Sequence, residues 1–251
     1  MDYHVHSLGH AAFRPIPAEI APFLECARQR GIAEIGLADH DRYAAAFDWR
    51  AVRETAATYP EVTVRFGVEV DYRSGGKPAI RALLGTLPRD FATGSVHNIG
   101  EWNFDHPDHR DGFDRYDPDE LYRIYFGEVA ACAASGLFQI IGHLDLIKIW
   151  GHRPRGDVVA LAGVALRAIA GAGAAVELST AGLRRPVAET YPSLPLLQEA
   201  YRMNIPLTLS SDAHRPEEVG QEIDLAARIA RQAGYRTVTG FSHCRSRQVE
   251  L

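Results

Sequence analysis

The fold of this chain is decided by the stretch Leu207-Thr208-Leu209-Ser210-Ser211-Asp212-Ala213-His214. It begins as a short apolar run of the kind that forms a buried strand, and it ends in two potential metal-binding side chains. Asp212 and His214 are two residues apart, so they face the same way on an extended chain. The stretch therefore predicts a strand that presents a carboxylate and an imidazole at its carboxyl end.

Three more apolar runs end in a histidine in the same manner. They are Met1-Asp2-Tyr3-His4-Val5-His6, Ile35-Gly36-Leu37-Ala38-Asp39-His40 and Gln139-Ile140-Ile141-Gly142-His143. A fold that gathers the carboxyl ends of its strands would bring these side chains together. The rest of the sequence is most simply explained as a scaffold for that cluster.

Strand-like and helix-like segments alternate along the chain. Strands are expected at 2–6, 32–38, 62–70, 91–97, 137–141, 174–178 and 206–209, with a last short one at 236–241. Helices are expected at 17–31, 48–59, 117–136, 158–170, 193–203 and 216–233, with a short one after the turn at 74–76. This alternation predicts a parallel sheet covered by helices.

The expected strands are apolar on both faces, as in a barrel wall, and polar residues cluster where strands end. An open doubly wound sheet is the alternative, but such a sheet normally gathers its site at one switch point. The sequence therefore favours an α/β barrel. The long connection at 98–117, rich in Asp, His and aromatic residues, is expected to be functional or mobile.

Length and composition limit the number of domains, the possible partners and the location of the protein. At 251 residues with no repeat or linker, the chain is expected to form a single domain over residues 1–251. The net charge of −5 argues against stable binding of nucleic acid through its phosphates. The three cysteines form no CxxC pair, and neither a signal peptide nor an apolar run of about 18 residues is present. We therefore expect a cytoplasmic protein without membrane partners.

The first candidate ligands are histidines near the amino terminus. His4 and His6 project to one side of the expected strand, and such a pair on a rigid strand supplies two metal ligands at low entropic cost. His10 follows four residues after His6 and can reach the same pocket. The alternative for each is an ordinary core or surface histidine.

Further candidates end the next strands. His40 lies between two carboxylates, Asp39 and Asp41, and such carboxylates often hold the distal ring nitrogen of a metal ligand. Glu69 is an acid in an apolar strand, where an unpaired carboxylate is costly but a position between two cations is not.

The joint pattern is stronger than any single residue. His97, His143, Asp212 and His214 complete a set of nine nitrogen and oxygen donors at the carboxyl ends of six strands. Donors of these types without thiolates favour Zn, Mn or Fe. Nine donors are too many for one ion, so two or three divalent ions are expected.

Several segments resemble the PHP (polymerase and histidinol phosphatase) superfamily of metal-dependent phosphoesterases, and in particular its histidinol-phosphate phosphatase branch. They are Asp2-Tyr3-His4-Val5-His6, Gly67-Val68-Glu69-Val70-Asp71-Tyr72, Gly94-Ser95-Val96-His97, Gly142-His143-Leu144-Asp145-Leu146, Thr180-Ala181-Gly182-Leu183-Arg184 and Ser211-Asp212-Ala213-His214. The resemblance covers nearly the whole chain.

This resemblance implies a distorted (β/α)7 barrel with a trinuclear site. By motif, the first ion would be held by His4, His6, Glu69 and Asp212, and the second by His10, His40 and His214. Glu69 would bridge to a third ion bound by His97 and His143. The interval between His6 and His10 is shorter than is usual in the family, which leaves open whether His10 is a ligand.

A water that bridges two cations has its pKa lowered and attacks phosphorus in line. We expect the catalytic groups to be Glu69, Asp212 and His214, with His214 or an Asp-held water protonating the leaving alkoxide. Cations at loop starts are expected to bind the phosphate: Lys148, Arg184, Arg185 and Arg215. The resemblance implies phosphate binding at Lys148 and Arg184. The alternative for all four is a solvated surface charge.

The expected reaction is hydrolysis of L-histidinol phosphate to L-histidinol and phosphate, a step of histidine biosynthesis. Trp102 and Asp105 in the 98–117 connection would close over the cationic amine, unless this segment is a solvated irregular loop. One alternative is another specificity in the same superfamily, such as a general phosphomonoester, a nucleotide or a short oligonucleotide. A non-enzymatic alternative is a metal-stabilised interaction module. The oligomeric state cannot be predicted.

Overall fold

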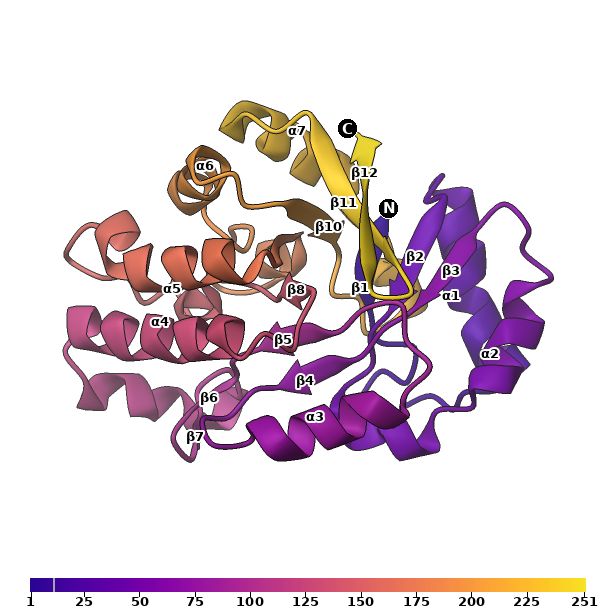
Figure 1. Ribbon diagram of the computed structural model, residues 1–251, viewed down its shortest axis with the longest axis horizontal. Coiled ribbons are helices and arrows are strands. Elements are labelled where there is room, and N and C mark those ends of the chain that lie inside the picture. The colour runs from indigo at the N-terminus through magenta and orange to yellow at the C-terminus, as the bar shows by residue number, and fades with distance from the viewer. Residues whose placement is uncertain (11) are drawn as a thin grey trace.

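The computed structural model describes residues 1–10 and 12–251, with helices surrounding a central group of strands (Figure 1). The strands are β1 (Asp2–Val5), β2 (Glu34–Leu37), β3 (Thr63–Phe66), β4 (Glu69–Asp71), β5 (Thr93–Ser95), β6 (Asn98–Ile99), β7 (Trp102–Asn103), β8 (Ile140–Ile141), β9 (Ala175–Ser179), β10 (Leu207–Ser210), β11 (Thr237–Ser242) and β12 (Arg245–Glu250).

Seven α-helices and five 3₁₀ helices connect these strands in the described part of the chain. The α-helices are α1 (Pro17–Gln29), α2 (Trp49–Ala56), α3 (Lys77–Thr86), α4 (Pro118–Ala134), α5 (Val158–Ala172), α6 (Leu194–Arg202) and α7 (Ile223–Ala233). The 3₁₀ helices are η1 (Asp41–Ala46), η2 (Pro107–Arg115), η3 (Leu146–Lys148), η4 (Ala181–Arg184) and η5 (Pro216–Glu218). Among the described residues, no helix is long and apolar enough to cross a membrane.

The central strands form two parallel sheets, in the orders β1-β2-β3 and β10-β9-β8-β5-β4. Two isolated parallel bridges, Val5 with Ala213 and His40 with Glu69, link one sheet to the other. The predicted α/β fold with parallel strands is therefore confirmed. Because the strands run the same way, their carboxyl ends lie along a common edge.

Helix α4 illustrates how local sequence sets these elements. The Asp117 carboxylate accepts hydrogen bonds from the backbone N–H groups of Asp119 and Glu120, and Pro118 occupies the first helical turn. Leu121, Tyr125 and Val129 form part of its buried face. The capping signal and the apolar periodicity therefore agree on the position of this helix.

The expected strand at 62–70 is interrupted, and this prediction was wrong in detail. It forms two short strands, β3 and β4, separated by Gly67 and Val68. The fully buried ring of Phe91 lies against Gly67, where an added Cβ would be 2.2 Å from the ring atom Cζ. The aromatic ring therefore occupies the space that a side chain at position 67 would need.

Substitution of Gly67 by alanine is expected to destabilise the protein by about 1–3 kcal/mol, because the buried Phe91 ring must shift. Urea unfolding monitored by circular dichroism measures this loss. Gly85→Ala is the matched control, since a Cβ there meets nothing within 4 Å and Ala is favoured over Gly in helix α3. Equal stability of the Gly67→Ala variant and the unaltered protein would contradict the packing argument.

The expected helix at 216–233 is also split. It forms η5 and α7, and Gly220 and Glu222 between them have left-handed φ angles of 67° and 58°. The bend lets the N–H of Gly220 donate to the Asp2 carboxylate at 2.8 Å. The expected amphipathic helix is therefore interrupted where its backbone forms a long-range hydrogen bond to β1.

The last expected strand, 236–241, corresponds to β11, but it pairs with an unexpected antiparallel partner, β12. This hairpin packs against β1, where the N–H of Phe241 donates to the Tyr3 hydroxyl at 2.7 Å. The buried Glu34 carboxylate accepts hydrogen bonds from Tyr3, Arg65 and Arg247 beside it. Strand β11 of the hairpin therefore packs into the core, whereas β12 is mostly exposed.

Candidate metal centre

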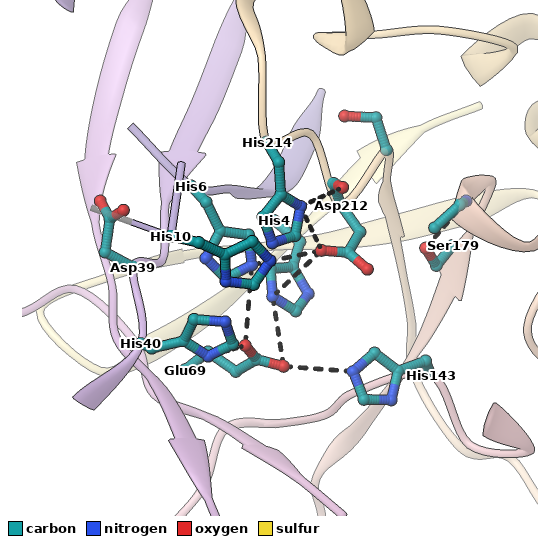
Figure 2. A network of polar contacts seen from close by, with 12 residues as sticks. His4, His6, His10, Asp39, His40, Glu69, His143, Ser179, Asp212 and His214 are labelled. Carbon is teal, nitrogen blue, oxygen red and sulfur yellow. Dashed lines mark hydrogen bonds and ion pairs between the residues drawn. The ribbon is translucent and has the colours of Figure 1, made fainter. Parts of the chain in front are cut away.

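The candidate ligands lie where the parallel strands end or begin, and Figure 2 shows His4, His40 and His143 turned toward Glu69. His4 belongs to β1 and Glu69 to β4, while Asp212 follows β10. The remaining candidates directly follow strands or, for His10, lie in the first loop: His6, His10, His40, His97, His143 and His214.

The first group consists of His4, His6, Glu69 and Asp212. The Nε2 atoms of His4 and His6 lie 3.5 and 3.6 Å from oxygens of Glu69. Asp212 Oδ1 lies 3.2 Å from His6 Nε2 and 3.9 Å from His4 Nε2. These are separations at which several ligand atoms can share one ion.

The second group shares the same glutamate. The Nε2 atoms of His97 and His143 lie 3.5 and 3.1 Å from Glu69 Oε1. One carboxylate therefore faces histidines from four strand ends, because His40 Nδ1 also lies 2.8 Å from Glu69 Oε2. Glu69 is therefore the residue that the first and second groups share.

The third group contains His6, His40 and His214, whose ligand atoms lie within 4.8 Å of one another. The resemblance placed His10 in this group instead of His6. The His10 ring stacks on His214 at 4.1 Å and lies 5.2 Å from the ring of His40, and Arg42 Nη2 donates to its Nδ1 at 3.3 Å. The structure therefore brings His10 to the edge of the group.

Gly9 allows the chain to turn tightly between His6 and His10. Its φ is +47°, and an added Cβ would lie 2.6 Å from the carbonyl oxygen of His214. Only glycine lets the backbone pass so close in this conformation. The tight approach turns His10 back toward His214 despite the short connection from His6.

The chemistry of these groups fits divalent metal ions. Buried polar atoms in proteins almost always have a hydrogen-bond partner. Here eight buried ring and carboxylate atoms have no partner in hydrogen-bond geometry among the described residues, although some lie close to one another: His4 Nε2, His6 Nδ1 and Nε2, His40 Nδ1 and Nε2, Glu69 Oε2, His143 Nδ1 and His214 Nε2. Metal coordination would satisfy the nitrogen and oxygen lone pairs that the fold leaves without partners.

A protein-family model for the PHP domain matches residues 2–181. This chain belongs to the PHP family. It is 37% identical, over 96% of each chain, to a probable histidinol-phosphatase from Deinococcus radiodurans. The relationship therefore covers nearly the whole chain and extends beyond the matched domain.

Two solved structures share the PHP chain's fold. A histidinol phosphate phosphatase from Lactococcus lactis, in complex with zinc, L-histidinol and phosphate, is 22% identical with a TM-score of 0.78 and 98% coverage of both chains. A putative histidinol phosphatase from Listeria monocytogenes is 16% identical with a TM-score of 0.69, covering 89% of this chain and 98% of its own.

The pKa is lowered in some histidines of the PHP site and raised in others. Burial and the neighbouring His214 hold the pKa of His6 well below its usual range, and burial lowers the pKa of His10 to about 4. These rings are neutral and ready to bind a cation at neutral pH. By contrast, although burial opposes it, Glu69 and Asp71 raise the pKa of His97 to about 10.

Metal binding at the His97 group should therefore release protons. The metal-free ring is protonated at about pH 8 and must lose its proton to become a ligand, so affinity should rise up to about tenfold per pH unit below the raised pKa. Calorimetric zinc titration in buffers of different ionisation enthalpy measures the proton count. His106→Ala, in an exposed loop, is the control, and zinc binding without proton release would refute this expectation.

Glu177 was missed from the sequence, although an acid inside the apolar run at 174–178 was a signal. It is fully buried on β9, and its Oε1 lies 2.6 Å from His4 Nδ1. Its Oε2 accepts the backbone N–H of His143, also at 2.6 Å. Glu177 therefore directs His4 Nε2 toward the metal site and connects two ligand groups.

The carboxylate of Asp39 is expected from the sequence to bind the imidazole ring of a metal ligand. In the structure it binds the segment of Ser7 and Leu8 instead. It accepts hydrogen bonds from Ser7 N and Oγ and from Leu8 N, at 2.7 to 3.2 Å. Asp2 links β1 to the end of β10, since its carboxylate accepts a hydrogen bond from Ser211 N at 2.8 Å. Both acids therefore set the course of ligand-bearing segments.

All the candidate ligands except His4 line a pocket whose wall also includes Asp105, Arg185 and Tyr191. Asp105 Oδ1 is buried without a hydrogen-bond partner among the described residues. A neighbouring cleft of about 680 Å³ is lined by Arg184, Arg185 and Arg215. The PHP site thus combines candidate metal ligands with nearby guanidinium groups, with Asp105 in the pocket wall and Glu217 and Glu218 in the neighbouring cleft.

Trp102, expected to contact substrate, belongs to the core of its own segment. Its Nε1 donates to the His109 carbonyl at 2.9 Å, and its ring packs on Phe113 and stacks on Tyr116. The 98–117 segment contains β6, β7 and η2 around the buried Phe104, so it is not a solvated irregular loop.

Lys148, expected to bind phosphate, is 1% exposed and already paired. Its Nζ lies 2.8 Å from each of three acceptors, in Asp145, Glu189 and Thr190. The ammonium group is therefore already held by these partners, and the structure offers no free cation at Lys148 for a phosphate. Arg184 donates to the carbonyls of Ser211 and Asp212 at 2.8 and 3.2 Å, while its Nη1 is buried without a partner among the described residues.

Proposed function

We propose that this chain hydrolyses L-histidinol phosphate to L-histidinol and phosphate. The observation that carries the proposal is the shared carboxylate of Glu69, which connects two ligand groups within one pocket. The full-length relationship to a probable histidinol-phosphatase supports this substrate. The small phosphomonoester would bind with its phosphate toward the ligand groups and Arg185.

The proposed cofactors are two or three divalent ions, Zn, Mn or Fe, since the donors are imidazoles and carboxylates without thiolates. Such ions polarise phosphoryl oxygens and lower the pKa of bound water. Glu69 and Asp212 supply negative charge to the ion sites, and burial keeps their attraction to the imidazoles strong. The proton for the leaving alkoxide would come from His214 or from a water held by Asp212.

Arg185 is the proposed phosphate-binding cation in the pocket, with Arg184 and Arg215 beside it in the cleft. A guanidinium group matches two phosphate oxygens at once. The proposed architecture around this site is one domain with a distorted (β/α)7 barrel, in which β3 and β4 form one interrupted strand. The bridges from Val5 to Ala213 and from His40 to Glu69 support that closure.

Asp105 is the proposed partner of the cationic amine of histidinol phosphate. Asp105→Asn should raise KM for this substrate by about tenfold, because a buried charge-assisted hydrogen bond contributes about 1.5–3 kcal/mol. KM for an aryl phosphate, which lacks the amine, should change little. Equal effects on both substrates would refute the assignment. Asp108→Asn, an exposed acid in the same segment, is the matched control.

A substrate panel tests the proposed function. We expect kcat/KM of the metal-loaded protein for histidinol phosphate to exceed that for an aryl phosphate, a nucleoside monophosphate and a phosphodiester. A higher value for the nucleotide or the diester would assign another specificity of the PHP family. Absence of turnover with every ester would favour a metal-stabilised interaction module.

A further inference from the structure

Tyr191 lies in the pocket wall with a hydroxyl group that nothing in the described structure uses. The residue is 1% exposed, and its Oη has no hydrogen-bond partner among the described residues. It lines the same pocket as His143, Asp105 and Arg185. A buried O–H group without an acceptor is costly, so its presence calls for a partner that binds there.

Other buried tyrosines in the described part of the chain do not share this property. The hydroxyls of three of them donate to backbone carbonyls at 2.8 to 3.3 Å, namely Tyr122, Tyr125 and Tyr235, and that of Tyr3 donates to the Glu34 carboxylate. The fold therefore provides acceptors for tyrosines that only fill the core. Tyr191 differs because it lines the pocket that contains the candidate metal ligands and its hydroxyl has no acceptor among the described residues.

The backbone and ring of Tyr191 are held firmly. Its carbonyl accepts from Ser179 N at 2.6 Å and its N–H donates to Ser179 O at 3.0 Å, which fixes the residue beside the end of β9. Its ring lies edge-on to that of His143, with 6.4 Å between centroids. At Gly182 an added Cβ would lie 3.0 Å from the ring atom Cζ of Tyr191, so the glycine leaves room for the hydroxyl end.

Lys148 completes this support from the side away from the ligands. Its ammonium group binds the carbonyl of Thr190 and the carboxylate of Glu189, the two residues before Tyr191, and lies 5.5 Å from the Tyr191 ring centroid. The buried cation thus fixes the segment that carries Tyr191. A rigid donor loses little entropy when it binds a ligand.

We propose that the Tyr191 hydroxyl donates a hydrogen bond to a phosphoryl oxygen of the substrate. The inference rests on the proposed phosphatase function and adds a substrate-contacting residue to it. An anionic oxygen suits this position because Arg185 and the His143 ligand group lie in the same pocket. Burial raises the pKa of Tyr191, so the phenol keeps its proton and remains a donor at neutral pH.

Tyr191→Phe tests the proposal because it removes only the oxygen. We expect kcat/KM for histidinol phosphate to fall by about 10- to 100-fold. This is the effect of removing one hydrogen-bond donor to an oxygen that gains negative charge in the transition state. Binding of inorganic phosphate to the zinc-loaded protein, measured by calorimetry, should weaken by about 10- to 100-fold, the effect of one hydrogen bond to a charged group. Zinc content should not change.

Tyr235→Phe is the matched control, because its hydroxyl bonds the Ile205 carbonyl far from the pocket. It should lower thermal stability and leave phosphate binding unchanged. Unchanged phosphate affinity and unchanged turnover in Tyr191→Phe would overturn the proposal. If the unaltered protein hydrolyses no phosphomonoester, the proposed function fails, whereas phosphate calorimetry still decides the role of Tyr191.

Discussion

Replacement of Glu69 by glutamine is expected to lower kcat for histidinol phosphate by at least about 1000-fold, equivalent to roughly 4 kcal/mol of transition-state stabilisation. Glu69 Oε1 lies within 3.5 Å of ligand nitrogens in His4, His97 and His143. Glutamine keeps the side-chain volume but removes the negative charge that two ligand groups share. Bound zinc, measured by atomic absorption, should fall together with kcat.

The matched control for this variant is Glu34→Gln. Glu34 is also a buried glutamate, but its hydrogen bonds go to Tyr3, Arg65 and Arg247 beside the C-terminal hairpin. Its loss should lower thermal stability without removing zinc. Full zinc content and near-normal turnover in Glu69→Gln would show that the shared carboxylate is not needed for metal binding.

Removal of the Glu177 carboxylate should give the second large effect. Glu177→Ala leaves His4 Nδ1 and the N–H of His143 without their buried acceptor. We expect zinc affinity to fall by about 10- to 100-fold, as for other partners of metal-binding histidines. Competition with a chromophoric chelator measures this change.

Two features separate this effect from general unfolding. Excess zinc should restore most of kcat in Glu177→Ala, because the metal ligands themselves remain. The zinc affinity of Glu177→Gln should lie between that of Glu177→Ala and that of the unaltered protein, since the glutamine amide oxygen can accept from only one of the two N–H donors. Unchanged zinc affinity in both variants would contradict the role assigned to Glu177.

The positions of the ligand candidates follow from local sequence. Each apolar run that ends in a histidine forms a parallel strand or leads out of one, so residues such as His40 and His143 reach a common edge. Strand direction and side-chain type are sufficient for that prediction. The division of the histidines into groups is not, because it depends on backbone turns such as that at Gly9.

Residues with distant partners were harder to predict. Lys148 is neutralised by Asp145 and by Glu189, which lies 41 residues away in the sequence. Trp102 packs within its own segment, and nothing in its spacing distinguishes that position from a lid over substrate. In both cases the residue type suggested a ligand contact, whereas tertiary packing had already used the side chain.

The breaks within elements have the same origin. Residues 62–70 have the composition of one strand, but the ring of Phe91 divides them at Gly67. Residues 216–233 have the periodicity of one helix, but Gly220 turns toward Asp2. Long-range contacts override local propensity at both places.

Zinc titration of chelator-treated protein tests the central claim most directly. Phosphate release from histidinol phosphate is followed as zinc is added to the unaltered protein and to His143→Ala. The account predicts no turnover without metal, a rise that saturates with bound zinc, and little activity in the variant at any zinc concentration. Full activity of the metal-free protein, or equal activity of His143→Ala, would contradict it.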